Sequence, residues 1–196
     1  MTRTGMALCG SLVFYSGMLA AENFSYNQLQ LEANNTEMSL SGLNDDDAGY
    51  AIAGTLRLPR SFYLAGHYET AEISNIDFTN YSAGIGAFAS VSEGVDLFGE
   101  LAYVKEETDY RNVSLDDGGA GLTLGVRGML TPFLEAEARY RYADFGSNTG
   151  EMNSFQASGM YKVTDMLGVG LKYRRDDVDE TDAKRTVVAA FVRASF

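Results

Sequence analysis

The chain has 196 residues, of which 45% are hydrophobic and 12% aromatic, with 21 glycines and only 2 prolines. This composition is too apolar for a disordered chain and too evenly mixed for a bundle of membrane-spanning helices. Fifteen basic residues stand against 27 acidic ones, and the net charge of −12 argues against a nucleic-acid partner. One cysteine and one histidine leave little for disulfide, metal or acid–base chemistry. We therefore expect no cofactor, no metal site, no catalytic residues and no enzymatic activity.

Residues 1–21 carry the three parts of a secretory signal peptide. Arg3 and the amino terminus supply positive charge, positions 6–19 form an apolar stretch, and small residues occupy positions 20–21. With these flanks, the apolar stretch is too short for a membrane-spanning helix. We predict that 1–21 is removed, which would leave a mature chain of 22–196 with no cysteine and a net charge of −13.

Along the mature chain, apolar residues alternate with polar or small ones. In 49–58, for example, Tyr50 and Ile52 share one face of an extended chain, while Ala51 and Ala53 share the other. An amphipathic helix repeats every 3.6 residues and cannot produce this period of two. The pattern predicts ten strands, at 24–33, 49–58, 62–72, 79–90, 95–106, 118–130, 133–144, 154–163, 166–175 and 185–196.

The predicted connections between these strands alternate in length. Short ones fall at 59–61, 91–94, 131–132 and 164–165, and longer ones at 34–48, 73–78, 107–117, 145–153 and 176–184. Bacterial outer-membrane barrels have short periplasmic turns, longer external loops and strands of about ten residues across the bilayer. We predict an all-β fold over 22–196, a transmembrane antiparallel up-and-down β-barrel of ten strands, with eight as the alternative.

The charged residues divide unequally between the two faces of these strands. The apolar face carries only Glu72, Lys105, Asp144 and Arg175, all at the long-connection ends. The other face carries eight bases and five acids: Arg57, Glu69, Asp96, Glu100, Arg127, Glu135, Glu137, Arg139, Arg141, Lys162, Lys172, Arg174 and Arg193. A charge facing the bilayer midplane costs about 2–4 kcal/mol. The apolar face is therefore predicted to meet lipid, and the charged face to line the lumen.

A soluble ligand-binding barrel such as a lipocalin would bury the same apolar face inside. Such a barrel has eight strands, whereas this chain has ten predicted strands and ends VVAAFVRASF, with Phe196 last. This ending resembles the last strand of Gram-negative outer-membrane barrels, and 42–69 (GLNDDDAGYAIAGTLRLPRSFYLAGHYE) resembles a hairpin of the small OmpA/OmpX-like family. The resemblance covers 22–196 and implies the outer membrane, contact with its lipid and lipopolysaccharide, and recognition of Phe196 by the barrel assembly machinery. Members of the family include adhesins, serum-resistance factors, structural barrels and small porins.

The five longer connections carry 15 acids and only two bases, Arg111 and Lys184. This charge is typical of a solvated surface, and it also suits divalent cations or a basic external partner. The runs at 45–47 and 176–182 resemble calcium loops, but Tyr50 or Asp182 occupies the position where an EF-hand needs glycine.

Two further features of the predicted lumen call for a choice of interpretation. His67 points inward beside Glu69, and without a second histidine we interpret it as a hydrogen-bonded lumen residue rather than a catalytic one. The glycine pairs 84/86, 119/121 and 168/170 are followed by no helix. They are predicted to make room for large side chains in the lumen rather than to bind phosphate.

The charges predicted to face the lumen allow two functions. Because a narrow barrel is filled by its own side chains, we predict an Arg–Glu plug and a non-catalytic role in surface interaction, adhesion or envelope integrity. The alternative is a narrow pore for small solutes, mildly anion-preferring because of three surplus bases. The plug predicts that Arg127→Ala or Glu100→Ala destabilises the barrel more than any loop substitution.

Overall fold

The structure is a computed structural model that describes residues 24–40, 43–73, 76–110, 113–146, 150–178 and 183–196. The predicted signal peptide at 1–21 lies outside the described residues. Within the described ranges, no helix is long and apolar enough to span a membrane.

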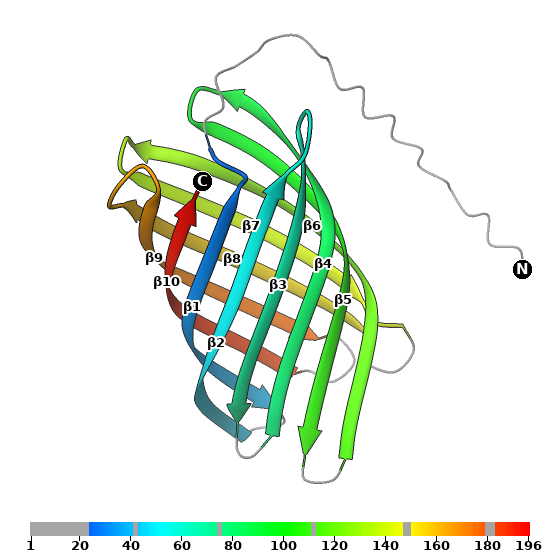
Figure 1. Cartoon of the computed structure of the whole chain (residues 1–196). Coiled ribbons are helices and arrows are strands. Elements are labelled where there is room, and N and C mark those ends of the chain that lie inside the picture. Colours follow the sequence, from blue (N-terminus) through cyan, green and yellow to red (C-terminus); the bar gives the residue numbers. More distant parts are fainter. Residues whose placement is uncertain (1–23, 41–42, 74–75, 111–112, 147–149, 179–182) are drawn as a thin grey trace, which may run out of the picture.

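Ten antiparallel strands form one closed barrel, as predicted (Figure 1). Each strand pairs with its neighbours in the sequence, and β10 returns to pair with β1, so that Gln28 lies opposite Ser195. The first and last strands therefore begin and end at the same end of the barrel. The strands are β1 (Gln28–Leu40), β2 (Leu43–Arg57), β3 (Phe62–Ile73), β4 (Ile76–Ser92), β5 (Val95–Tyr110), β6 (Val113–Thr131), β7 (Leu134–Asp144), β8 (Glu151–Lys162), β9 (Leu167–Val178) and β10 (Ala183–Ser195).

The alternation in the sequence corresponds to the two faces of the wall. On β9, Leu171 is 67% exposed, whereas Lys172 and Arg174 on the opposite face are 3% and 8% exposed. Large apolar side chains are exposed on strands all around the barrel, and an apolar belt of this kind is stable against lipid. The predicted assignment of the apolar face to the outside is confirmed.

Nine of the ten strands are longer than predicted, and the correction falls mainly on the long connections. The first strand starts at Gln28 instead of residue 24 and continues to Leu40, where it pairs with Leu43 of β2. Most of the predicted connection at 34–48 is therefore strand, and 107–117 is likewise mostly strand. Beyond the lipid belt, both faces of a strand can be polar while the backbone ladder continues. A prediction from polar composition alone therefore makes these strands too short and the loops between them too long.

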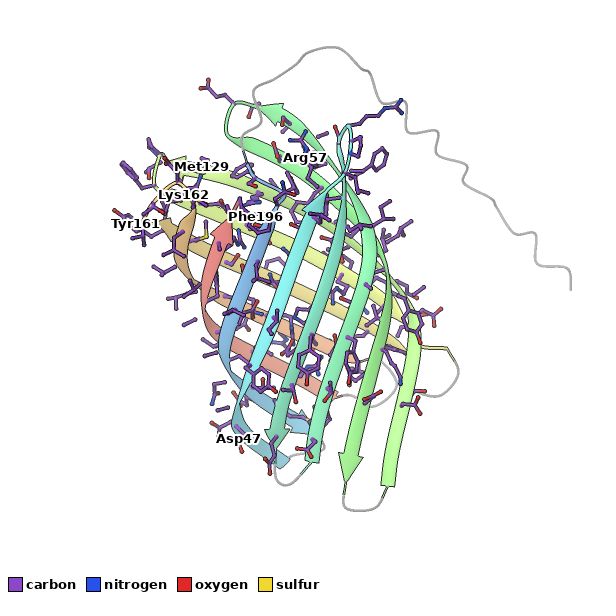
Figure 2. The ribbon with its side chains drawn as sticks, in the orientation of Figure 1. Asp47, Arg57, Met129, Tyr161, Lys162 and Phe196 are labelled. Carbon is purple, nitrogen blue, oxygen red and sulfur yellow. The ribbon has the colours of Figure 1, made fainter. Side chains whose placement is uncertain are left out.

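The two ends of the barrel differ in chemistry. Asp47 lies at one end, and Arg57, Lys162 and Phe196 lie at the other (Figure 2). The apolar belt reaches the end that holds Phe24 and Phe196, which is periplasmic in such barrels. At the opposite end the strands continue past the exposed tyrosines into acidic sequence. We call this end the external rim, defined by its exposed acids Glu37, Asp46, Asp47, Glu72, Asp77, Asp116, Asp144 and Glu151.

Candidate functional site

An aromatic cluster fills the periplasmic end of the lumen. Phe24 and Tyr26, which precede β1, are about 5% and 4% exposed and pack with Tyr63, Phe88 and Phe98. The rings of Tyr26 and Phe88 stack with centroids 3.9 Å apart, and those of Tyr26 and Tyr63 are 5.0 Å apart. Two residues that were predicted to begin the first strand thus precede it and pack inside the lumen. The sequence signal for this inward position is the alternation itself, because positions 24, 26, 28 and 30 share one face.

A buried ion-pair network lies against this cluster. Arg127 donates from Nε and Nη2 to the two carboxylate oxygens of Glu135, at 2.7 and 3.0 Å. Arg193 donates from Nη1 to Glu135 Oε1 at 2.7 Å. The Arg127 guanidinium also lies 4.6 Å from the centroid of the Phe24 ring. Because all three charged groups are buried, each needs its partner to offset the loss of water.

A second network lies in the lumen toward the external rim. Arg174 donates to both carboxylate oxygens of Glu69, at 2.6 and 2.9 Å, and from Nε to Asp176 at 3.1 Å. Asp176 also accepts from Arg185 Nε at 2.8 Å and from the Ser154 hydroxyl at 2.6 Å. Beside this network, buried apolar side chains fill the external part of the lumen: Val104, Ala143, Phe145 and Met152.

The inward direction predicted for the charged residues is confirmed, and the structure adds four groups to the lumen. Glu32 pairs with Lys172, and Asp176, Arg185 and Glu106 belong to the external network. The predicted loop position of Asp176 is wrong, because β9 continues to Val178 and directs this carboxylate inward. The additions are three acids and one base, so the predicted surplus of three lumen bases falls to one. The electrostatic argument for an anion-preferring pore is correspondingly weaker.

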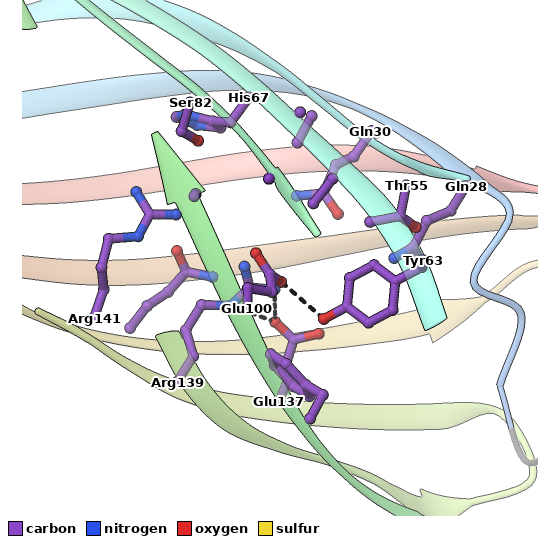
Figure 3. Close-up of a pocket in the computed structure, with 18 of the residues that line it drawn as sticks. Gln28, Gln30, Thr55, Tyr63, His67, Ser82, Glu100, Glu137, Arg139 and Arg141 are labelled. Atoms are coloured by element: carbon purple, nitrogen blue, oxygen red, sulfur yellow. Dashed lines mark hydrogen bonds and ion pairs between the residues drawn. The ribbon is translucent and has the colours of Figure 1, made fainter. Parts of the chain in front are cut away.

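Between the two networks lies a polar cavity of about 90 Å³ (Figure 3). One water molecule needs roughly 10–15 Å³ of such space, so the cavity has room for several. Its lining includes Tyr63, whose hydroxyl donates to Glu100 at 3.0 Å, and Arg139, which pairs with Glu137. Arg141 also lines the cavity.

His67 lies on the wall of this cavity, as its strand phase predicted. Its Nε2 is 3.7 Å from Glu69 Oε2, and its buried Nδ1 has no hydrogen-bond partner among the described residues. Ser82 is its cross-strand neighbour, but no hydrogen bond joins the two side chains. The Glu69 carboxylate is already bound by Arg174 through both oxygens. These contacts do not form the nucleophile–base–carboxylate relay that a hydrolase needs.

The prediction that inward glycines make room for large lumen side chains is confirmed for Gly86, Gly168 and Gly170, whereas a Cβ on Gly84 or Gly119 would meet the backbone of the neighbouring strand. A Cβ on Gly86 would lie 2.2 Å from the Tyr63 ring, and one on Gly170 would lie 2.4 Å from the Phe191 ring. Both approaches are closer than real Cβ atoms tolerate, so the aromatic filling of the lumen depends on these glycines.

At the external rim, acids lie directly opposite acids. Glu72 pairs in register with Asp77 and Asp144 with Glu151, and all four side chains are exposed. The same arrangement relates Glu37 and Asp46 on β1 and β2. Like charges in this relation destabilise a sheet. In the part of the chain that the structure describes, no group of three or more metal-ligating side chains is placed to hold an ion.

No family model and no curated protein matches this sequence. Among solved structures, the β domain of the Bordetella autotransporter BrkA is similar with a TM-score of 0.55 and 10% identity, over 87% of this chain and 100% of that one. Neisserial surface protein A matches with a TM-score of 0.46 and 16% identity, over 88% and 98% of the two chains. Ail, the attachment invasion locus protein of Yersinia pestis, matches with a TM-score of 0.43 and 14% identity, over 88% and 99%. With its closed up-and-down sheet and its apolar belt, this chain has the fold of a Gram-negative outer-membrane β-barrel.

Proposed function

We propose that the protein is a closed, non-catalytic barrel of the outer membrane that binds a basic partner at the cell surface through its external rim. The observation that carries this proposal is the set of exposed acid–acid pairs, such as Glu72 with Asp77 and Asp144 with Glu151. Each pair costs stability in the free barrel. A cationic surface that bound across the two strands would remove this repulsion, and the free energy gained would add to the binding affinity.

The charge of the external rim is only partly compensated by the chain itself. Lys105 lies 2.6 Å from Glu107 and 3.3 Å from Asp116, and Arg175 lies 3.4 Å from Asp177. No ion pair of this kind joins a base to Glu72, Asp144 or Glu151 among the described residues. These pairs therefore keep their charge available to a partner or to divalent cations from the medium.

Two layers of side chains support a silent lumen rather than a pore. The periplasmic layer contains Tyr26 and Arg127, the external layer contains Arg174 and Asp176, and these residues are buried. The test is the single-channel conductance of residues 22–196 refolded into a planar bilayer, with heat-modifiable gel migration as proof of folding. A silent bilayer is the expected result. Discrete conductance steps would assign the protein to the small pores.

Binding at the external rim can be tested with a matched pair of variants. Glu72→Gln/Asp77→Asn removes two charges from the external rim, whereas Glu93→Gln/Asp165→Asn removes two exposed charges from the periplasmic end. The probe is a short oligolysine peptide, titrated against each refolded barrel at low and high salt. We expect weaker, less salt-dependent binding for the external-rim variant alone. Equal binding by all three proteins would leave envelope integrity as the better role.

The remaining partners are proposed from the barrel's surface. The apolar belt would contact lipid, and the exposed tyrosines at its external edge would meet lipopolysaccharide head groups. Phe196 is 66% exposed beside the closing seam, where its backbone nitrogen donates to the Asn27 carbonyl at 3.0 Å. An exposed terminal aromatic ring at the seam is accessible to an assembly factor before the barrel closes.

A further inference from the structure

Arg141 differs from the other arginines of the central cavity in its partners. Arg139 pairs with Glu137, and Arg174 pairs with Glu69 and Asp176. Arg141, by contrast, has no carboxylate oxygen within 4.0 Å among the described residues. Its one hydrogen bond runs from Nε to Thr123 Oγ1 at 3.3 Å. The remaining N–H groups of this guanidinium face the cavity (Figure 3).

The neighbours of Arg141 add positive charge on the same side of the cavity. Arg139 precedes it by two residues and shares its face of β7. Arg139 lies opposite Gln156, which in turn lies opposite Arg174. The Gln156 amide also lines the cavity. One wall of the cavity therefore carries three guanidinium groups in adjacent positions, of which only Arg141 lacks a carboxylate.

The opposite wall is polar and incompletely bonded. His67 and Ser82 line it from β3 and β4, and the buried His67 Nδ1 has no partner among the described residues. Glu100 lines the same cavity, but its carboxylate accepts the Tyr63 hydroxyl at 3.0 Å and is not within ion-pair distance of Arg141. Arg141 is half-buried, and a group inside the cavity can bond to its remaining N–H groups.

We propose that the central cavity binds one small monovalent inorganic anion, of the chloride class, against the Arg141 guanidinium. The Arg141 guanidinium can donate to one monovalent anion through N–H groups that have no partner among the described residues. A cavity of about 90 Å³ holds a halide with a few waters. The layers around Tyr26 and Arg174 border the cavity on either side. This site does not depend on the external rim or on the partner proposed for it.

The direct test uses bromide as the probe, because its anomalous scattering identifies it in a crystal. The full barrel, refolded and crystallised from sodium bromide, should show an anomalous peak within hydrogen-bond distance of Arg141. Arg141→Gln should lose this peak, and Arg175→Gln, which changes an exposed arginine on the outer face, should keep it. Water alone bridging Arg141 to Glu100, or bromide only at the barrel surface, would overturn the proposal.

A solution measurement covers the case in which Arg141→Gln does not fold. The thermal midpoint of the unchanged barrel should rise by about 2–4 °C when chloride replaces gluconate at constant ionic strength. Glu100→Gln should bind bromide more tightly, because it removes a negative charge from the cavity wall. A midpoint independent of chloride, together with unchanged bromide occupancy in Glu100→Gln, would also contradict the site.

Discussion

Inside the barrel, Glu135 accepts hydrogen bonds from Arg127 and Arg193 and is 2% exposed, whereas at the external rim Glu72 lies opposite Asp77 with both carboxylates exposed. The same residue type is thus matched with cations in one region and set against other anions in the other. The difference follows from the solvent. A buried carboxylate without a partner costs several kcal/mol, while an exposed like-charge pair costs only about 0.2–1 kcal/mol.

The charges of the lumen and of the external rim therefore serve different purposes. Most charges that line the lumen cavity are paired across the wall, and Arg141 and Glu100 are the two without an ion pair among the described residues. The external rim contributes little to stability and keeps its charge accessible. Substitutions in the lumen should change stability, and substitutions in the external rim should change binding.

Arg127→Ala should have the largest effect on stability. It removes a guanidinium that binds both oxygens of Glu135 and stacks on Phe24, and it leaves Glu135 with Arg193 alone. Breaking a buried pair in this way costs about 3–5 kcal/mol. The measurement is equilibrium urea unfolding of the refolded barrel. The control is Arg175→Ala at an exposed pair, for which we expect a loss of about 0–1 kcal/mol. Similar losses in the two variants would show that the lumen network does not hold the wall.

Glu100→Ala should destabilise the barrel less than Arg127→Ala. The variant loses the hydrogen bond from the Tyr63 hydroxyl and leaves that buried group to be satisfied by water in the cavity. An unmade hydrogen bond of this kind costs about 1–3 kcal/mol. Glu100→Gln keeps an acceptor for Tyr63 and should lose less than the alanine variant in the same urea unfolding series. The reverse order would mean that the charge of Glu100, rather than its hydrogen bond, stabilises the lumen.

Gly86→Ala tests whether the lumen is filled by shape as well as by charge. The new methyl group would lie 2.2 Å from the Tyr63 ring and would force that ring out of its contacts. Overpacking of this kind costs about 1–3 kcal/mol. Gly159→Ala is the matched control, because its Cβ would meet nothing within 4 Å. We expect a lower urea midpoint for Gly86→Ala alone. Equal midpoints would show that Tyr63 moves at no cost.

The strand number, the barrel topology and the two faces of the wall were predictable, because a period of two is a local signal that each strand repeats. Along β9, for example, the alternation of Leu171, Lys172 and Tyr173 already separates lipid from lumen. The strand ends were not predictable in the same way. Above the lipid belt both faces are polar, so the pattern that identifies a strand fades while its backbone pairing continues.

The candidate site was predictable as a set of inward charges but not as a set of partners. The pairing of Arg174 with Glu69 joins β9 to β3, two strands that are not neighbours in the sheet. Which side chains meet depends on how far each one extends across the lumen. The alternation along a strand does not give this information. Asp176 was missed because the acidic run around it resembles a loop, whereas Glu32 continues the inward phase of the first predicted strand and was predictable.

The smallest effect on stability, and the clearest contrast with the lumen, is expected from Glu72→Gln/Asp77→Asn. Removing both charges relieves the repulsion between opposite positions of β3 and β4, so the barrel should become more stable by about 0.2–1 kcal/mol. The gain should shrink in high salt, because exposed charges are screened over about 8 Å at physiological ionic strength. Urea unfolding at two salt concentrations measures both quantities. A loss of stability would mean that these carboxylates hold a cation or a contact that stabilises the free barrel, and the external rim would then resemble the lumen in using its charge structurally.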